Sequence, residues 1–323
     1  MSALHVDASV SERIALACSM LGDLAETDVP LAPLTTYKVG GAAALFTRPR
    51  HIDDLDRIGA AATAAGLPTL VVGRGSNLLV ADRGFDGIAI SLANLGAAHR
   101  IEGSDVVAGA MVALPQLARQ VVAASLSGFE WAVGVPGSMG GAVRMNAGGH
   151  GGDIAGCLVE ALIVDLRTGA RGWLSPDRLG LRFRGSDLAS HQVVVEARIR
   201  LRAGDRAASE AELDDIVRWR REHQPGGQNA GSVFINPIPG ELSAGELIDR
   251  VGLRGLVHRT ASVSTKHANF IQGSEGGRAV DVVELIELVR RRVADETGFV
   301  LRSEVRLVGF EGVPVDESPG VVV

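Results

Sequence analysis

The alternation of apolar and polar positions along the chain predicts many short strands interleaved with a few helices. Between residues 43 and 72, a strand, a helix with apolar residues at helical spacing and a second strand make a β-α-β unit. Strands are expected at residues 43–47, 69–72, 78–81, 88–91, 106–108, 158–166, 171–174, 192–202, 232–235 and 299–308, with a β-prone run at 35–41. Helices are expected at residues 11–21, 51–65, 113–126, 210–223, 244–251 and 278–297.

The pattern of apolar and charged residues changes near residues 203–206. Before this point the apolar runs are short and β-like, whereas the later part contains a charged helix and the clearest amphipathic helix of the chain. We therefore predict two domains with two flanking segments. These are a loosely attached lead-in (1–29), a first domain (30–204), a second domain (205–310) and a disordered tail (311–323).

Two glycine-rich stretches follow apolar runs and are the first candidates for chemistry. Gly73–Asn77 comes directly after the strand expected at 69–72, and residues 134–149 contain six glycines and one proline among sixteen residues. Such density predicts that no regular helix crosses the second stretch, and that its backbone amides are open to an anion. The G-x-G-x-x-G spacing is absent. We predict a diphosphate cradle, hence a nucleotide cofactor held mainly by loop amides.

Composition and charge narrow the class of protein. The chain has 323 residues, 46% of them hydrophobic, which is enough for two cores. Its net charge of −6 argues against nucleic acid or an anionic membrane as a partner. Its two cysteines form no CxxC or Cys/His cluster, and it shows neither a signal pattern nor a long apolar run. We expect a cytoplasmic protein without a bound metal ion.

Three polar residues lack an evident structural role. Arg184 precedes an apolar strand, Ser232 opens another, and Glu304 interrupts the last strand between two arginines. Each of them, taken singly, is more often a surface or capping residue. The residues alone therefore indicate a nucleotide-binding α+β protein and do not name a reaction.

Six motifs occur in the order found in UDP-N-acetylenolpyruvoylglucosamine reductases (UDP-N-acetylmuramate dehydrogenases), which this chain resembles over about 270 residues. They are Thr35–Gly41, Gly73–Leu79, Gly134–Gly148, Ala230–Pro237, Val263–Ile271 and Glu304–Arg306. The resemblance implies an α+β fold: a PCMH-type FAD-binding domain of two α+β lobes, and a C-terminal α+β substrate-binding domain that closes over the flavin.

The resemblance also implies the reaction. NADPH reduces a non-covalent FAD, and the flavin then passes hydride to enolpyruvyl-UDP-GlcNAc, which yields UDP-N-acetylmuramate for peptidoglycan synthesis. Arg184 matches the family arginine that holds the carboxylate and stabilises an enolate. Glu304 matches the glutamate that polarises the enolate while protonated. Ser232 matches the proton donor to the carbanion.

The same motifs imply two sets of binding residues. The cofactor set is Gly73, Arg74, Gly75, Ser76, Asn77, Leu78, Gly134, Val135, Pro136, Ser138, Gly140, Gly141, Ala147 and Gly148. The substrate set is Asn236, Arg306, Arg220 and His267. We expect no partner beyond the substrate and NADPH, and a monomer.

The chain departs from the family pattern at a few positions. They are Phe183 and Gly185 around the arginine, Ile235 in place of a frequent lysine, and Arg259-Thr260 in place of two glycines. One branch of the family clamps its substrate with a tyrosine on an inserted loop. The only tyrosine here is Tyr37, far upstream, so the chain resembles the shorter, loop-lacking branch (type II-like).

Two other classes of protein stay open. One is a PCMH-type oxidase or dehydrogenase of a small hydroxy compound, in which His150 would be the candidate for a covalent flavin link. The other is a non-catalytic protein that senses a nucleotide sugar or a flavin. Acid release of the flavin separates the first class from the reductase, and substrate-dependent NADPH turnover separates the second.

Overall fold

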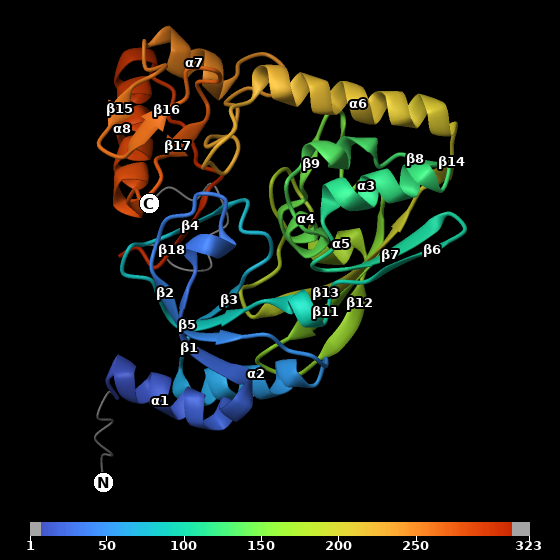
Figure 1. The fold of residues 1–323 in the computed structure, drawn as a ribbon, viewed down its shortest axis with the longest axis vertical. Helices are drawn as coiled ribbons and strands as arrows, with labels where there is room; N and C mark the ends of the chain where they lie inside the picture. Colours follow the sequence, from blue (N-terminus) through green and yellow to red (C-terminus); the bar gives the residue numbers. More distant parts are fainter. Residues whose placement is uncertain (1–7, 312–323) are drawn as a thin grey trace.

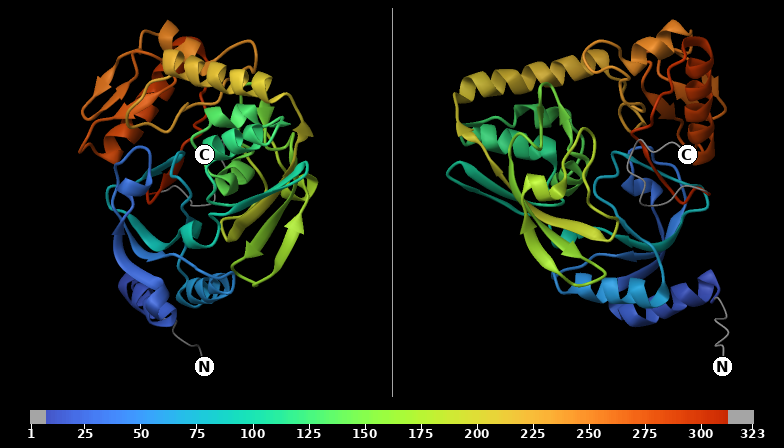
Figure 2. Two further views of the ribbon diagram at one scale, coloured as in Figure 1. Left: turned by 45° about the vertical axis from the view of Figure 1, so that its right-hand side comes forward. Right: turned by 180° about the vertical axis from the view of Figure 1, so that it is seen from behind.

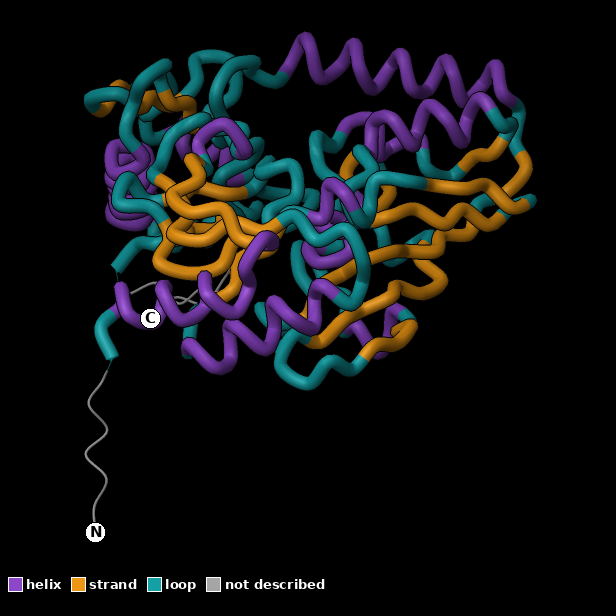
Figure 3. The backbone as a smooth tube through the Cα atoms, turned by 60° about the horizontal axis from the view of Figure 1, so that its bottom comes forward, coloured by secondary structure: helices purple, strands orange, loops and turns teal. Residues whose placement is uncertain are grey.

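The computed structural model describes residues 8–311, which form two α+β lobes and a C-terminal domain (Figure 1). In the first lobe the sheet has the order β1-β2-β5-β3, with β2 and β3 parallel to β5 and β1 antiparallel to β2. Its helices lie side by side across one face of that sheet (Figure 3). The elements are α1 (Val10–Leu21), β1 (Ala25–Pro30), β2 (Ala42–Thr47), α2 (Asp54–Ala65), β3 (Thr69–Val71), β4 (Leu78–Val80) and β5 (Phe85–Ile90).

Residues 8–29 are an integral part of this lobe, in contrast to the loosely attached lead-in predicted above for residues 1–29. Ser9 and Glu12 form a capping box that starts α1. Ala17 and Leu21 are fully buried, and β1 adds an edge strand through the pairing of Ala25 with Thr47. Apolar burial on α1 and the ladder to β2 therefore fix this segment in place.

The second lobe is a five-stranded antiparallel sheet in the order β12-β11-β13-β7-β6. Helices α3 and α4 share its apolar core, which includes Phe129 and Trp131. The elements are β6 (His99–Glu102), β7 (Asp105–Gly109), α3 (Leu114–Ala123), β8 (Leu126–Ser127), α4 (Met139–Met145), β9 (Gly148–Gly149), β10 (Gly152–Asp153), β11 (Leu158–Asp165), β12 (Arg171–Leu174), α5 (Pro176–Leu179) and β13 (Gln192–Arg200).

Helix α4 corrects the prediction that no helix crosses the glycine-rich stretch. Its side chains Met139, Ala142 and Val143 are buried in the core of the second lobe. Gly140 permits this packing, because a Cβ there would lie 2.8 Å from the Cβ of Ala110. Burial of one apolar face thus outweighs the low helix propensity of two glycines.

An 18-residue helix, α6 (Arg206–His223), leads from the second lobe to the C-terminal domain (Figure 2). That domain contains a three-stranded antiparallel sheet, β15-β16-β17, packed against α8. The short strand β14 (Arg202–Ala203) precedes α6 and pairs with β8 of the second lobe. The elements after α6 are α7 (Ala244–Arg250), β15 (Val257–His258), β16 (Ala261–Val263), β17 (Ile271–Gly273), α8 (Ala279–Thr297) and β18 (Arg306–Val308).

The end of the described chain returns to the first lobe. The strand predicted at 299–308 is only β18, and it pairs in parallel with β4 of the first lobe. Tyr37, Val39 and Leu79 of that lobe share the apolar core of the C-terminal domain. The strand predicted at 232–235 is a single bridge between Phe234 and Ser303, and the run at 35–41 forms no strand. The first lobe and the C-terminal domain are therefore joined by a common core.

The tail predicted at 311–323 lies, apart from its first residue, outside the described residues. Within residues 8–311, no helix combines the length and the apolar character needed to cross a membrane.

Candidate active site

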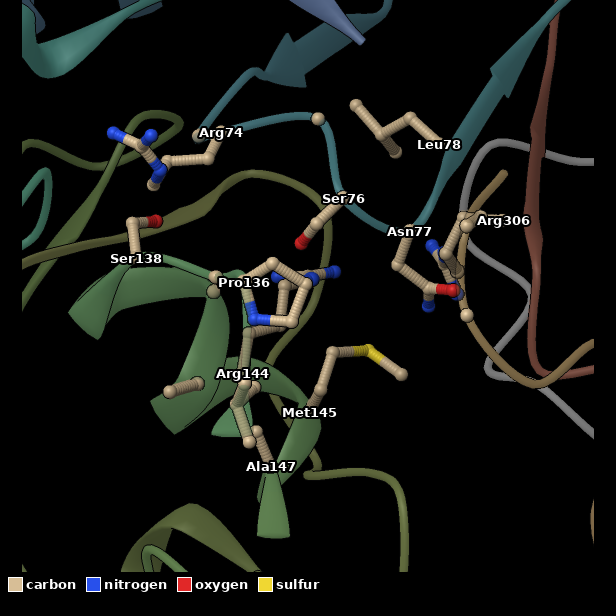
Figure 4. A pocket seen from close by; sticks show the side chains of 18 of the residues that line it. Arg74, Ser76, Asn77, Leu78, Pro136, Ser138, Arg144, Met145, Ala147 and Arg306 are labelled. Atoms are coloured by element: carbon tan, nitrogen blue, oxygen red, sulfur yellow. The ribbon is translucent and has the colours of Figure 1, made fainter. Parts of the chain in front are cut away.

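A cavity of about 360 Å³ lies where the two lobes and the C-terminal domain meet. All residues of the predicted cofactor set line it: five from the loop before β4, the first residue of β4 itself, and eight from the glycine-rich stretch. In the close view, Arg74 and Ser138 lie together at one side, while Asn77 and Arg306 lie together at the other (Figure 4). The two glycine-rich stretches are separate in the sequence, but they line one cavity. The loop at 73–77 forms a wall of this cavity, and residues 134–148 form its floor.

Two glycines of this pocket are required by the packing of the protein itself, and two others leave room for a cofactor that approaches the backbone closely. Gly75 has φ +62°, and a Cβ there would meet the Leu34 carbonyl oxygen at 2.0 Å. A Cβ on Gly73 would meet Ser138 Oγ at 2.7 Å. At Gly137 and Gly141 a Cβ would make only ordinary contacts with the protein, so it would stand in the space of the pocket. A flat, phosphate-bearing group such as FAD fits this floor.

The sequence predicts that backbone amides of the glycine-rich stretch hold the diphosphate, but two of these amides already have partners within the protein. The amides of Met139 and Gly140 donate to the carbonyls of Val112 and Ala110, both at 2.9 Å, so these two amides are not available to a ligand. Polar side chains can supply donors in place of these two amides, because Arg74, Arg144 and Ser138 also line the pocket. Arg144 was missed by sequence reasoning. The sequence does contain a signal for it, because Arg144 is a positively charged residue within the glycine-rich stretch. It lies on α4, which was not predicted.

Arg184 is held across the pocket between two parts of the chain. Its backbone has φ +58°, a left-handed conformation that few non-glycine residues adopt. Its Nη1 donates to the Gly148 carbonyl at 3.0 Å, and its Nε lies 3.2 Å from Glu304 Oε2. The guanidinium carbon also lies 5.0 Å from the centroid of the Phe183 ring. These contacts aim a fixed cation into the cavity.

Backbone hydrogen bonds bring the segments of Ser232 and Glu304 together. The Glu304 amide donates to the Val233 carbonyl at 2.7 Å, directly beside Ser232. On its other side, the Glu304 carbonyl accepts from Asn77 Nδ2 at 2.9 Å. Ser232, Glu304 and Arg184 all line the cavity. The structure therefore places the three predicted catalytic residues in one site, although they are up to 120 positions apart in the sequence.

Burial perturbs the carboxyl group of this site. Only 17% of the Glu304 side chain is exposed, and burial raises the pKa of Glu304 above its ordinary value, although the nearby Arg184 cation opposes the shift. Burial also lowers the pKa of Arg220, which lines the same cavity. A carboxyl whose pKa is raised can hold its proton and donate a hydrogen bond.

The predicted substrate set divides in two. Arg220 and Arg306 line the cavity, and Arg220 is oriented by a 2.8 Å hydrogen bond from its Nε to Gln224 Oε1. Asn236 and His267 do not line it. The Asn236 side chain instead accepts from the amide of Ala244 at 3.1 Å, and His267 packs against the ring of Phe270. In this structure each of these two side chains therefore has its partner within the C-terminal domain, and their contact with the substrate stays a prediction.

His150 does not line the cavity. Its ring packs edge-on against Trp219 of α6, with 5.1 Å between the ring centroids, and the side chain is exposed. The pair Arg259-Thr260 also lies away from the cavity. Arg259 and Thr260 both bind Asp281 of α8, so this departure from the family pattern serves packing of the C-terminal domain.

Acidic, histidine and cysteine side chains do not gather around a common point in the part of the chain described here. Within residues 8–311 there is no group of three or more that could hold a metal ion.

Two family models match the chain. Residues 43–172 match an FAD binding domain, and residues 223–308 match the C-terminal domain of UDP-N-acetylenolpyruvoylglucosamine reductase. The two matches correspond to the two lobes that carry the glycine-rich stretches and to the domain that carries Ser232 and Glu304. They agree with the fold class predicted from the sequence.

Whole-length relatives agree with these matches. The UDP-N-acetylenolpyruvoylglucosamine reductase of Heliobacterium modesticaldum is 42% identical, over 89% of this chain and 91% of its own. That of Acidiphilium cryptum is 41% identical, over 88% and 91%. The crystal structure of the reductase from Thermus caldophilus superposes with a TM-score of 0.76 at 34% identity, over 88% of this chain and 98% of its own.

Proposed function

The chain belongs to the UDP-N-acetylenolpyruvoylglucosamine reductase family, and from this premise we propose that Arg184, Ser232 and Glu304 carry its reaction. The enzyme reduces enolpyruvyl-UDP-GlcNAc to UDP-N-acetylmuramate in peptidoglycan synthesis, with FAD and NADPH. The observation that carries the proposal is the convergence of these three side chains on the cavity lined by the glycine-rich stretches. Bound FAD supplies the carrier that takes hydride from NADPH and gives it to the enolpyruvyl group.

Arg184 holds the carboxylate of the substrate and stabilises the enolate that develops beside it. A guanidinium presents several donors in a fixed fork, which suits a planar carboxylate. Its position is set by the bond to Gly148 and the ion pair with Glu304 before the substrate arrives. Such preorganised donors are among the largest contributors to catalysis, worth on the order of 10²- to 10³-fold each.

Glu304 donates a hydrogen bond to the same developing enolate. This role requires the protonated carboxyl, and burial shifts the pKa of Glu304 in that direction. Arg184 lies 3.2 Å from Glu304 and favours the ionised form of this carboxyl. In this proposal Glu304 becomes protonated when the substrate carboxylate pairs with the guanidinium, because the cation then stabilises the Glu304 carboxylate less. Substrate binding and protonation of Glu304 are thus coupled in this proposal.

Ser232 gives its hydroxyl proton to the carbanion that remains after hydride addition. A serine hydroxyl is a weak acid in water, but it suffices against a strongly basic carbon when the two are correctly placed. The bond from the Glu304 amide to the Val233 carbonyl keeps the donor next to the polarising group. In this proposal Arg220 and Arg306 bind the diphosphate of the substrate, which is supported by the position of both cations in the cavity lining.

We also propose a cytoplasmic monomer. Every residue invoked above comes from one chain, so the site needs no second copy to be complete. Nucleotide sugars and NADPH are metabolites of the cytoplasm. Light scattering coupled to size exclusion tests the oligomeric state.

The function is tested by NADPH oxidation in the presence and absence of enolpyruvyl-UDP-GlcNAc. Oxidation should depend on this substrate, and mass spectrometry should find a product heavier by two hydrogens. A flavin that a small hydroxy compound reduces, and that NADPH does not, would favour the oxidase alternative. The absence of any turnover, with both ligands bound, would favour a sensor.

A further inference from the structure

The N-terminus of α8 is capped by a residue of another domain. The N-cap position is Arg278, which has no side-chain hydrogen bond to the helix. The first amides of the helix are instead satisfied by Asp82, whose Oδ1 accepts from Ala279 at 2.8 Å and whose Oδ2 accepts from Val280 at 3.2 Å. Asp82 precedes these residues by almost 200 positions and belongs to the first lobe.

These bonds satisfy two of the amides that a helix leaves unpaired at its N-terminus. Ala279 is fully buried, and Asp82 supplies the partner of its amide, whereas the bond to Val280 lies at the exposed side of the junction. The carboxylate also places a negative charge at the positive end of a 19-residue helix. Arg278 Nε lies 3.8 Å from Asp82 Oδ2 and adds a weaker attraction across the same junction.

Asp82 is itself fixed to the cofactor-binding lobe. It follows β4, and the amide of its neighbour Ala81 donates to the Val308 carbonyl of β18 at 2.8 Å. The loop before β4 is the first wall of the cavity, and Asn77 of that loop holds the Glu304 carbonyl. The cap therefore connects α8 to the same rigid strand pair that carries the cofactor loop.

On the other side of the junction, α8 supports the segment of Ser232. Val282 and Leu285 of α8 share one buried cluster with Val233 and Phe234, the two residues that follow Ser232. Because α8 and the residues next to Ser232 pack in one core, we expect a shift of α8 away from Asp82 to be transmitted to the backbone that positions the serine hydroxyl. By contrast, Arg184 belongs to the second lobe and is not attached to α8.

We propose that Asp82 is a positioning residue that sets the place of Ser232 over the cofactor through its bonds to α8. The inference rests on the proposed function, because it assigns to Asp82 an effect on the step that needs the serine proton. Displacement of a catalytic group by about 1 Å can cost up to 10²-fold in rate. We expect the loss of the cap to slow flavin reoxidation by enolpyruvyl-UDP-GlcNAc by about tenfold, and to change flavin reduction by NADPH less than about twofold.

The test compares four variants by stopped-flow absorbance of the flavin, with each half-reaction followed separately. Asp82→Ala removes the cap. Asp82→Asn keeps one acceptor oxygen but loses the second acceptor and the charge, so its rate of reoxidation should lie between those of the wild type and Asp82→Ala. The double variant Asp82→Ala/Arg278→Asp gives α8 a cap of its own but no bond between domains. Ser243→Ala is the matched control, because Ser243 caps α7 within the C-terminal domain alone.

Hydrogen exchange at Ala279 and Val280 gives a readout that is independent of activity, and it should rise in Asp82→Ala. The proposal predicts slow reoxidation in both Asp82→Ala and the double variant, and a normal ratio of half-reactions in Ser243→Ala. If the double variant regains wild-type reoxidation, Asp82 is merely a helix cap and the proposal is overturned. Should Asp82→Ala fail to fold, the double variant decides the question alone. A wild-type flavin that enolpyruvyl-UDP-GlcNAc does not reoxidise would instead overturn the proposed function.

Discussion

Gly140 and Gly141 are adjacent in the proposed cofactor cradle but have different surroundings, and we expect replacement of each by valine to have a different effect. A Cβ on Gly141 would have Ser138 Oγ at 3.5 Å as its nearest protein neighbour, an ordinary contact, and the residue is exposed to the cavity. A Cβ on Gly140 would lie 2.8 Å from the Ala110 Cβ and 3.3 Å from the Ala110 backbone. We therefore expect Gly141→Val to affect the cofactor and Gly140→Val to affect the fold.

The magnitudes follow from these contacts. Carbon atoms pack at about 3.5–4.0 Å, so valine at position 140 forces α4 away from Ala110 by on the order of 1 Å. Such overpacking costs about 1–3 kcal/mol of unfolding free energy. In Gly141→Val the fold loses nothing, since valine is a better helix former than glycine by a few tenths of a kcal/mol, roughly. A bound cofactor meets the added carbons instead, and a similar cost weakens its affinity by about ten- to hundred-fold.

The assay measures urea unfolding of the flavin-free proteins and titrates each with FAD. Gly172→Val on β12 is the control, because its Cβ would contact nothing within 4 Å and the residue does not line the cavity. It should bind FAD normally and unfold as the wild type does. Gly141→Val with wild-type FAD affinity would refute the assignment of this stretch as the cofactor floor. Gly140→Val with unchanged stability would refute the packing argument.

Three further predictions concern the reacting groups. Arg184→Lys keeps the charge but loses the fork that joins Gly148 and Glu304, and should slow reoxidation of the flavin by on the order of 10²-fold while NADPH still reduces it, as measured by stopped flow. Burial raises the pKa of Glu304, so the stability contributed by its protonated carboxyl is present below the ordinary value of 4.5 and is lost as pH rises through the raised folded-state pKa. Glu304→Gln cannot ionise, and its unfolding free energy should fall less than that of the wild type in urea melts from about pH 4 to about pH 8; an equal fall in both proteins would contradict this environment of the carboxyl. Because His150 packs on Trp219 outside the cavity, acid precipitation should release all the flavin, and colour retained in the pellet would contradict the non-covalent mode of binding.

Most helices and strands could be predicted because the spacing of apolar residues along the sequence shows which face of each element is buried. The strand at 158–166 and the helix at 278–297 match β11 (Leu158–Asp165) and α8 (Ala279–Thr297) within a residue or two. Two elements could not be predicted from local signals. Helix α4 packs in the core because Gly140 allows close contact with Ala110. Strand β18 is short because it pairs with the three-residue strand β4, which lies more than 200 positions away.

The candidate site shows the same division. Short motifs marked Arg184, Ser232 and Glu304, but their convergence depends on the Val233–Glu304 and Asn77–Glu304 bonds, which join distant segments. Asn236 and His267 lie in the same motifs and still miss the cavity, because each has a closer partner within its own domain. The capping of α8 by Asp82 could not be predicted from the sequence around either segment. The N-cap position of the helix is Arg278, which makes no side-chain hydrogen bond to the helix, and nothing near Asp82 indicates its distant partner.

The central claim is that Ser232 protonates the substrate carbanion, and stopped-flow absorbance of the flavin in Ser232→Ala tests it most directly. Reduction by NADPH should proceed nearly as in the wild type, and reoxidation by enolpyruvyl-UDP-GlcNAc should slow by about 10²-fold or more, the cost of a lost positioned proton donor. Ser232→Cys, which keeps a donor, should retain more of the second rate than Ser232→Ala. If Ser232→Ala slows both half-reactions equally, or slows neither, Ser232 is not the proton donor and the account of the site is wrong.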